Sequence, residues 1–137
     1  MTLASVQRSD VQPHYSKGEL SIAFVFSVPG ARENSAGRPV SGATGENLSF
    51  ALGHIHSELP AVFSSTDRYA YRIANAYSKP IAKSLGNASS QSSNKQVQAP
   101  ENIAKVLHDI GGCSVVILCG LKAQLLYVTA ILAALSK

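Results

Sequence analysis

The sequence predicts a small α/β protein in which helices cover both faces of a mainly parallel sheet. Short apolar runs alternate with segments whose apolar residues recur at helical spacing, as in consecutive βαβ units. Two of these runs, residues 20–28 and 114–120, are almost entirely apolar, which is typical of strands buried on both faces. We therefore expect one three-layer α/β/α domain over residues 19–137.

Length, charge and cysteine content are consistent with such a domain. The chain has 137 residues, enough for a buried core without disulfides, and its net charge of +4 is compatible with a polyanionic partner. Cys113 and Cys119 are too far apart along a strand to form a disulfide, and no Cys/His cluster indicates a metal site. We expect reduced thiols, no metal and no cofactor.

The N-terminal segment, residues 1–18, is polar and without periodicity. It contains no apolar stretch of the kind found in secretory signals. We therefore expect a flexible arm on a cytoplasmic protein.

The first half of the domain contains a strand, a helix and a second strand. The run at 20–28 is the first strand and stops at Pro29. Thr44 is placed to cap a helix that Pro60 ends, and residues 68–77 form a strand that ends near Asn75. The helical stripe consists of Leu48, Ala51, Leu52, Ile55 and Leu59.

The second half repeats this alternation after an irregular segment. Residues 84–98 are rich in Ser, Asn and Gln and form a loop that is either disordered or functional. Pro100 stands at the first position of a helix that Gly111 and Gly112 terminate. The strand at 114–120 follows, and a final helix occupies the residues from Leu121 onward.

The connection between the first strand and the first helix is rich in glycine and proline. In a parallel sheet, the loops after Val28 and Asn75 would leave the same edge, where such proteins bind ligands. A helix N-terminus at Thr44 and Gly45 would present free N–H groups to an anion. The glycines and prolines of this connection are Pro29, Gly30, Gly37, Pro39, Gly42 and Gly45.

The same stretch, PGARENSAGRPVSGATGENL, resembles the first motif of the uracil-DNA glycosylase superfamily. The family pattern runs Pro-Gly-x-x-Glu, then Gly-x-Pro-Phe-x-Gly-x-Ala-Gly, and Glu33 falls at the glutamate position. YRIANAY resembles the strand whose final asparagine reads uracil, here Asn75. ENIAKVLHDIGGCSVVILCGLKAQ resembles the next helix, strand and glycine, so the resemblance covers about residues 20–124.

The resemblance implies a glycosylase-like fold that excises or recognises uracil, or a related damaged base, in DNA by base flipping. Glu33 would position the attacking water, and Asn75 would hydrogen-bond the uracil edge, with Val28 and Val40 beside the base. The simpler interpretations are a solvated loop glutamate and a turn asparagine. Arg32 and Arg38 either contact phosphate or are ordinary surface charges.

Two departures from the family pattern indicate that excision is reduced or lost. Val40 stands where the family has an aromatic residue that stacks on the base, an interaction worth about 1–3 kcal/mol. Phe26 or Tyr77 would have to replace it. The final strand and histidine loop of the family have no counterpart after Gln124, so we expect a C-terminally incomplete domain.

Two other functions remain open. The chain is alternatively a non-catalytic nucleic-acid-binding module derived from the glycosylase fold. A phosphate- or nucleotide-binding α/β protein of another kind is disfavoured, because neither GxGxxG nor GxxxxGK[ST] occurs.

The last helix also points to a partner. Residues 125–135 contain a single polar residue, Thr129, and are too few to cross a bilayer. We expect self-association through this helix and no membrane partner.

Overall fold

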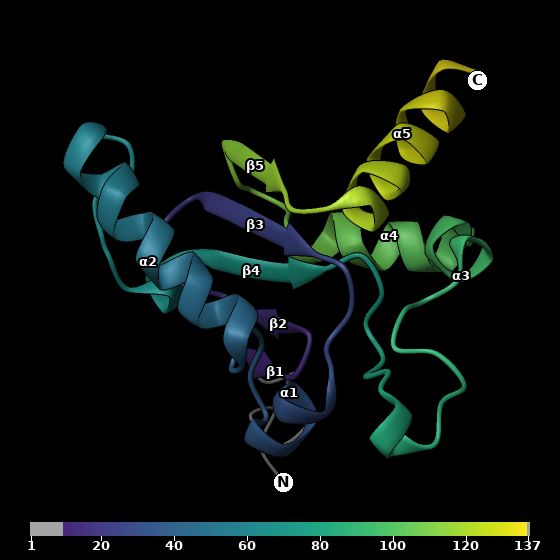
Figure 1. Ribbon diagram of the computed structural model, residues 1–137. Helices are drawn as coiled ribbons and strands as arrows, with labels where there is room; N and C mark the ends of the chain where they lie inside the picture. Colours follow the sequence, from purple (N-terminus) through teal and green to yellow (C-terminus); the bar gives the residue numbers. More distant parts are fainter. Residues whose placement is uncertain (1–9, 137) are drawn as a thin grey trace, which may run out of the picture.

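The computed structural model describes residues 10–136, which form a five-stranded sheet with helices on both faces (Figure 1). The strands are β1 (Val11–Gln12), β2 (Tyr15–Ser16), β3 (Ile22–Phe26), β4 (Arg72–Asn75) and β5 (Val115–Leu118). The helices are α1 (Ala31–Ala36), α2 (Ala43–Glu58), α3 (Asn94–Gln98), α4 (Pro100–Asp109) and α5 (Leu121–Leu135), with 3₁₀ turns at Arg68–Ala70 and Lys83–Leu85. The predicted α/β class is confirmed.

The sheet is parallel at its centre and antiparallel at one edge. Its strand order is β1-β2-β4-β3-β5. Phe24 of β3 lies opposite Ile73 of β4 on one side and Ile117 of β5 on the other, both in parallel register. Ser16 of β2 pairs with Ile73 in the antiparallel sense. The three parallel strands, β4, β3 and β5, therefore end at the same edge of the sheet.

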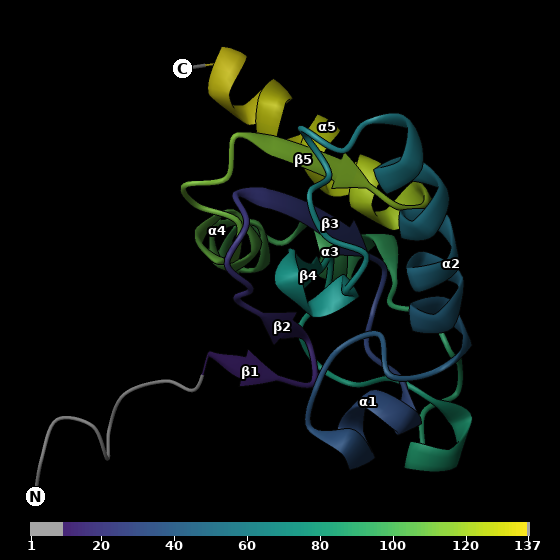
Figure 2. The ribbon, with the colours of Figure 1, turned by 90° about the vertical axis from the view of Figure 1, so that its left-hand side faces the viewer.

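A separate hydrophobic core fills the space on each face of the sheet. Figure 2 shows α2 on one side of the strands and α4 on the other. Under α2, Leu52 packs near Phe24 and Tyr71, whose rings meet edge to face at 5.4 Å. The opposite core joins α3, α4 and α5 to the sheet and consists of Ala23, Val25, Ala74, Ala76, Val97, Val106, Ile110, Ala123 and Leu126.

Part of the expected N-terminal arm is ordered. Residues 1–9 lie outside the described residues, but the next segment forms the β1–β2 hairpin at the sheet edge. Arg72 Nε donates to the Lys17 carbonyl at 2.8 Å, and Lys105 Nζ lies 3.1 Å from Nε2 of buried His14. These partners lie far away in the sequence, so local pattern alone does not indicate the hairpin.

Several element boundaries also differ from the sequence prediction. The strand predicted at 68–77 is shorter, because Arg68–Ala70 is a 3₁₀ turn and β4 spans only Arg72–Asn75. Helix α2 begins a residue before Thr44, with Gly42 as its N-cap. The loop at 84–98 ends in the short helix α3, because Ser93 and Gln96 form a capping box in which each side chain bonds the other's backbone N–H.

Helix α5 contacts the sheet only with its first half. Ala123 and Leu126 are fully buried, but the remainder runs beyond the sheet (Figure 1). The large exposed apolar residues of this helix are Leu121, Val128, Ile131, Leu132 and Leu135. Within the described chain, β5 ends the sheet, so its outer edge has no strand partner there. No helix in residues 10–136 combines the length and apolarity needed for a membrane span.

Candidate functional site at the carboxyl edge of the sheet

The loops after β3 and β4 leave the sheet side by side. Beyond the pair Phe26–Asn75, backbone N–H groups of the second loop continue to donate to carbonyls of the first. Tyr77 N–H donates to Ser27 at 3.0 Å, and Ile81 N–H donates to Pro29 at 2.9 Å. The glycine-rich connection, residues 29–45, therefore begins directly against the segment that follows Asn75.

The carboxylate of Glu33 links two parts of the glycine-rich connection by hydrogen bonds. Glu33 is the third residue of α1, and its Oε1 accepts a hydrogen bond from the N–H of the N-cap Gly30 at 2.8 Å. Its Oε2 accepts from the Ser41 N–H at 3.0 Å and from the Ser41 hydroxyl at 3.2 Å. One carboxylate thus joins the start of α1 to the residue just before Gly42.

These hydrogen bonds also set the charge of Glu33. Partial burial of the carboxyl raises its pKa, but donors from Gly30, Ser41 and its own backbone outweigh that effect and hold the pKa below its ordinary value. Glu33 is therefore an anion at neutral pH.

Val40 and Gly45 form the tightest contact of the connection. Val40 has a left-handed backbone, with φ of 44°, and its side chain is buried. Its carbonyl lies directly against the Cα of Gly45, where a Cβ would overlap it. The Tyr69 hydroxyl donates to the Pro39 carbonyl at 2.7 Å and to the Val40 carbonyl at 3.3 Å. A strained valine persists here because its surroundings hold both sides of it.

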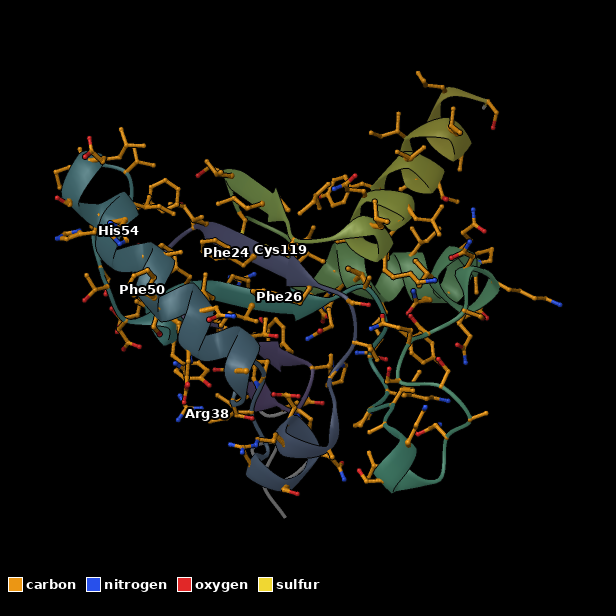
Figure 3. The ribbon with its side chains drawn as sticks, in the orientation of Figure 1. Phe24, Phe26, Arg38, Phe50, His54 and Cys119 are labelled. Atoms are coloured by element: carbon orange, nitrogen blue, oxygen red, sulfur yellow. The ribbon has the colours of Figure 1, made fainter. Side chains whose placement is uncertain are left out.

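Two arginines flank Tyr69 beside the start of α2. Cζ of Arg38 lies 3.5 Å from the centre of the Tyr69 ring, and Cζ of Arg68 lies 5.0 Å from it. Arg68 also donates to the Gly45 carbonyl and to the Ser49 hydroxyl, so it is fixed to α2. Figure 3 shows Arg38 next to the first turn of that helix. This cluster places positive charge at the N-terminus of a long helix.

The other residues predicted for this loop have structural positions in the fold. Val28 is half-buried just beyond β3, and Pro29 is buried. Gly37 ends α1 in the left-handed conformation, with φ of 72°. Arg32 lies along α1 with its Cδ close to Gly42 and borders a shallow hollow with Ser41.

Asn75 lies at the expected strand end, but the β1–β2 hairpin covers it. It is 3% exposed, and its Nδ2 donates to the backbone carbonyl of His14 at 3.0 Å. Within residues 10–136, the hydrogen bonds of Glu33 remain inside the glycine-rich connection, and that of Asn75 goes to the hairpin. The two residues therefore belong to separate hydrogen-bonded clusters at the same sheet edge.

A larger groove lies on the other side of the segment after β4. It has a volume of about 600 Å³ and is bordered by Tyr77, α3 and α4. Lys79, Lys95 and Lys105 line it. Sequence reasoning missed this group because its lysines are widely spaced and only the fold brings them together.

The described part of the chain offers no metal centre. Among residues 10–136, no three His, Cys, Asp or Glu side chains gather closely enough to bind a metal ion. Cys113 and Cys119 are both unpaired thiols, and burial raises the pKa of Cys119.

Comparison with protein-family models and with curated proteins finds no match to either. The resemblance to uracil-DNA glycosylases therefore rests on the order of residues in the sequence.

Proposed function

We propose that this chain is a uracil-DNA glycosylase-like protein that binds DNA at the carboxyl edge of its sheet and recognises a base there, with little or no excision. The observation that carries the proposal is the closed glycine-rich connection. Glu33 holds it in one shape through three hydrogen bonds, directly before the N-terminus of α2. A preorganised loop can approach a nucleotide closely without first paying an ordering cost.

Charge at this edge supports a phosphate-bearing ligand. Helix α2 has 16 residues, and the first N–H groups of a helix have no acceptor within it and carry partial positive charge. Arginine presents a planar set of donors that matches phosphate oxygens. The net charge of +4 adds a longer-range attraction for a polyanion.

Two features argue for recognition over rapid excision. Val40 is 5% exposed and aliphatic, so it provides no ring face for a flipped base. Losing base stacking weakens capture by about 1–3 kcal/mol, or roughly one to two powers of ten. In addition, a base could reach the Asn75 amide only by displacing the hairpin carbonyl of His14 that this amide now bonds.

Slow uracil excision is the second candidate, and the state of Glu33 favours it. The carboxylate is ionised, and its Oε1 accepts one hydrogen bond from the backbone of Gly30. A carboxylate in that state can orient water and stabilise positive charge that develops on a sugar.

The binding test uses fluorescent single-stranded DNA of about 15 nucleotides, a length that suits single-strand sites, with one central deoxyuridine or thymidine. Anisotropy titrations over a salt series should give affinity that falls with salt. Arg38→Gln should weaken binding to both strands and lower the salt slope by about 1. The matched control is Lys17→Gln, which replaces an exposed lysine on the hairpin side. It should leave the affinity and the salt slope unchanged.

A preference for the deoxyuridine strand would establish base recognition, and Asn75→Ala should remove that preference. Glycosylase activity is measured on the same strands by alkaline cleavage, and Glu33→Gln should abolish any product. Absence of DNA binding at low salt, or equal effects of Arg38→Gln and Lys17→Gln, would contradict the proposal. Rapid turnover by the wild type would replace it with the second candidate.

A further inference from the structure

The groove of about 600 Å³ beside the end of β4 has a composition that the glycine-rich connection does not explain. Three of the chain's seven lysines line it, together with one acidic residue, Glu101. The remaining lining residues are Tyr77, Ser78, Ser93, Gln96, Ala99 and Asn102. Volumes of this size are typical of small-ligand sites in proteins.

Buried hydrogen bonds hold the walls of the groove in place. Asn102 is 8% exposed, and its Nδ2 donates to the Ala76 carbonyl at 2.7 Å and to the Val97 carbonyl at 3.0 Å. This single amide ties α4 to the segment after β4 and to α3. Gln96 bonds the Ser93 N–H through Oε1, and its Nε2 lies 3.5 Å from the Tyr77 hydroxyl.

The lysines of the groove have different surroundings. Lys105 lies 3.1 Å from His14 Nε2 and 4.0 Å from Asp109 Oδ2, so its ammonium group is held at the α4 wall and partly compensated. Lys79 and Lys95 are exposed and line the groove from two different segments, one after β4 and one on α3. Positive charge therefore enters the groove from three structural elements.

We infer that this groove binds a phosphate-bearing nucleotide, with the phosphate among the three lysines and the base against Tyr77. Ammonium groups are strong donors to phosphate oxygens, and serine hydroxyls at the rim add neutral donors. An aromatic ring at the same site provides a surface for stacking a base of any kind. The phosphate belongs either to a free nucleotide or to a nucleotide within a DNA strand.

This inference does not depend on the function proposed for the glycine-rich connection. The groove lies on the α4 side of the sheet, and no residue that lines it belongs to residues 29–45. A chain that failed to bind DNA through Arg38 could still bind a nucleotide here.

The test measures calorimetric binding of deoxyuridine monophosphate, of deoxyuridine without phosphate, and of the single-stranded DNA used above. The nucleoside should bind at least about tenfold more weakly than the nucleotide, because it lacks the charged group that the lysines contact. Lys79→Glu combined with Lys95→Glu should weaken binding of the nucleotide by about tenfold or more. The control, Lys17→Glu with Lys83→Glu, makes the same change in net charge on exposed residues outside the groove and should stay within about twofold.

The two possible sources of phosphate are distinguished by which probe loses affinity for the variant that carries Lys79→Glu and Lys95→Glu. Loss confined to deoxyuridine monophosphate identifies a free-nucleotide site, and loss of DNA binding identifies a strand contact. Arg38→Gln should weaken binding of DNA and leave binding of the mononucleotide unchanged. A failure of the proposed DNA site can therefore be distinguished from a failure of the nucleotide groove. Equal binding by nucleoside and nucleotide, no binding of either phosphate-bearing probe, or equal effects of the groove variant and its control would overturn the inference.

Discussion

Replacing Gly45 with alanine tests whether direct backbone contact closes the glycine-rich connection onto α2. A Cβ at this position would overlap the carbonyl oxygen of Val40 and lie 2.6 Å from its carbonyl carbon. The carbonyl oxygen would have to retreat by roughly 1.5–2 Å to reach an ordinary contact distance. Gly53 is in the same helix, and a Cβ there meets nothing within 4 Å, so Gly53→Ala is the matched control.

The expected magnitude follows from what the Val40 carbonyl supports. Its retreat would disrupt the hydrogen bond that the Tyr69 hydroxyl shares between the Pro39 and Val40 carbonyls, worth about 1 kcal/mol. It would also unpack the buried Val40 side chain, worth about 2 kcal/mol. Against these losses, alanine favours the helical conformation over glycine by about 1 kcal/mol. We expect Gly45→Ala to lower the free energy of unfolding by about 2 kcal/mol and Gly53→Ala to raise it by about 1 kcal/mol.

Urea unfolding followed by circular dichroism measures both variants against the wild type. The chain contains no tryptophan, so the helical signal is the suitable probe. If Gly45→Ala stabilises the protein as much as Gly53→Ala does, the close approach of Val40 to α2 does not exist in solution. The loop geometry on which the proposed DNA site depends would then be wrong.

Two further predictions concern Glu33 and helix α5. Glu33→Gln should reduce stability at neutral pH by about 1.5 kcal/mol relative to the exposed control Glu19→Gln, because an amide nitrogen cannot accept from the donors that face it. The folded pKa of Glu33 is lowered, so this difference should be complete above its ordinary pKa and vanish as pH falls through the folded value; a gap that persists in strong acid would contradict the assignment. The wild-type chain should self-associate in sedimentation experiments, and Leu132→Glu with Leu135→Glu should shift it toward monomer. A wild type that is monomeric at high micromolar concentration would contradict that expectation.

Elements with a strong local pattern could be predicted from the sequence. The apolar runs gave β3 and β5 to within two residues, and Pro100 marks the first residue of α4 as expected. Helix α3 had a readable signal as well. Ser93 and Gln96 have the spacing of a capping box, but the surrounding polar composition led to the prediction of a loop.

Features that depend on distant partners could not be predicted. Strands β1 and β2 have two residues each, too few for any periodicity, and the partners of His14 lie on α4. For the same reason the sequence places Asn75 correctly at a strand end but does not indicate that the hairpin covers it. A sequence pattern is one-dimensional, and whether another element covers a residue is a property of the fold.

The half-buried placement of α5 also has a consequence for local stability. Its first turns are fixed by Ala123 and Leu126, but Leu132 and Leu135 are 62% and 77% exposed, so little packing energy opposes unwinding from the far end. Amide protons from about Ile131 onward should therefore exchange with solvent by fraying, without global unfolding, and those near Leu126 should exchange much more slowly. If a second copy covers the exposed half, exchange in the last two turns will slow as protein concentration rises. The gradient of exchange along one helix would then report the dimerisation equilibrium residue by residue.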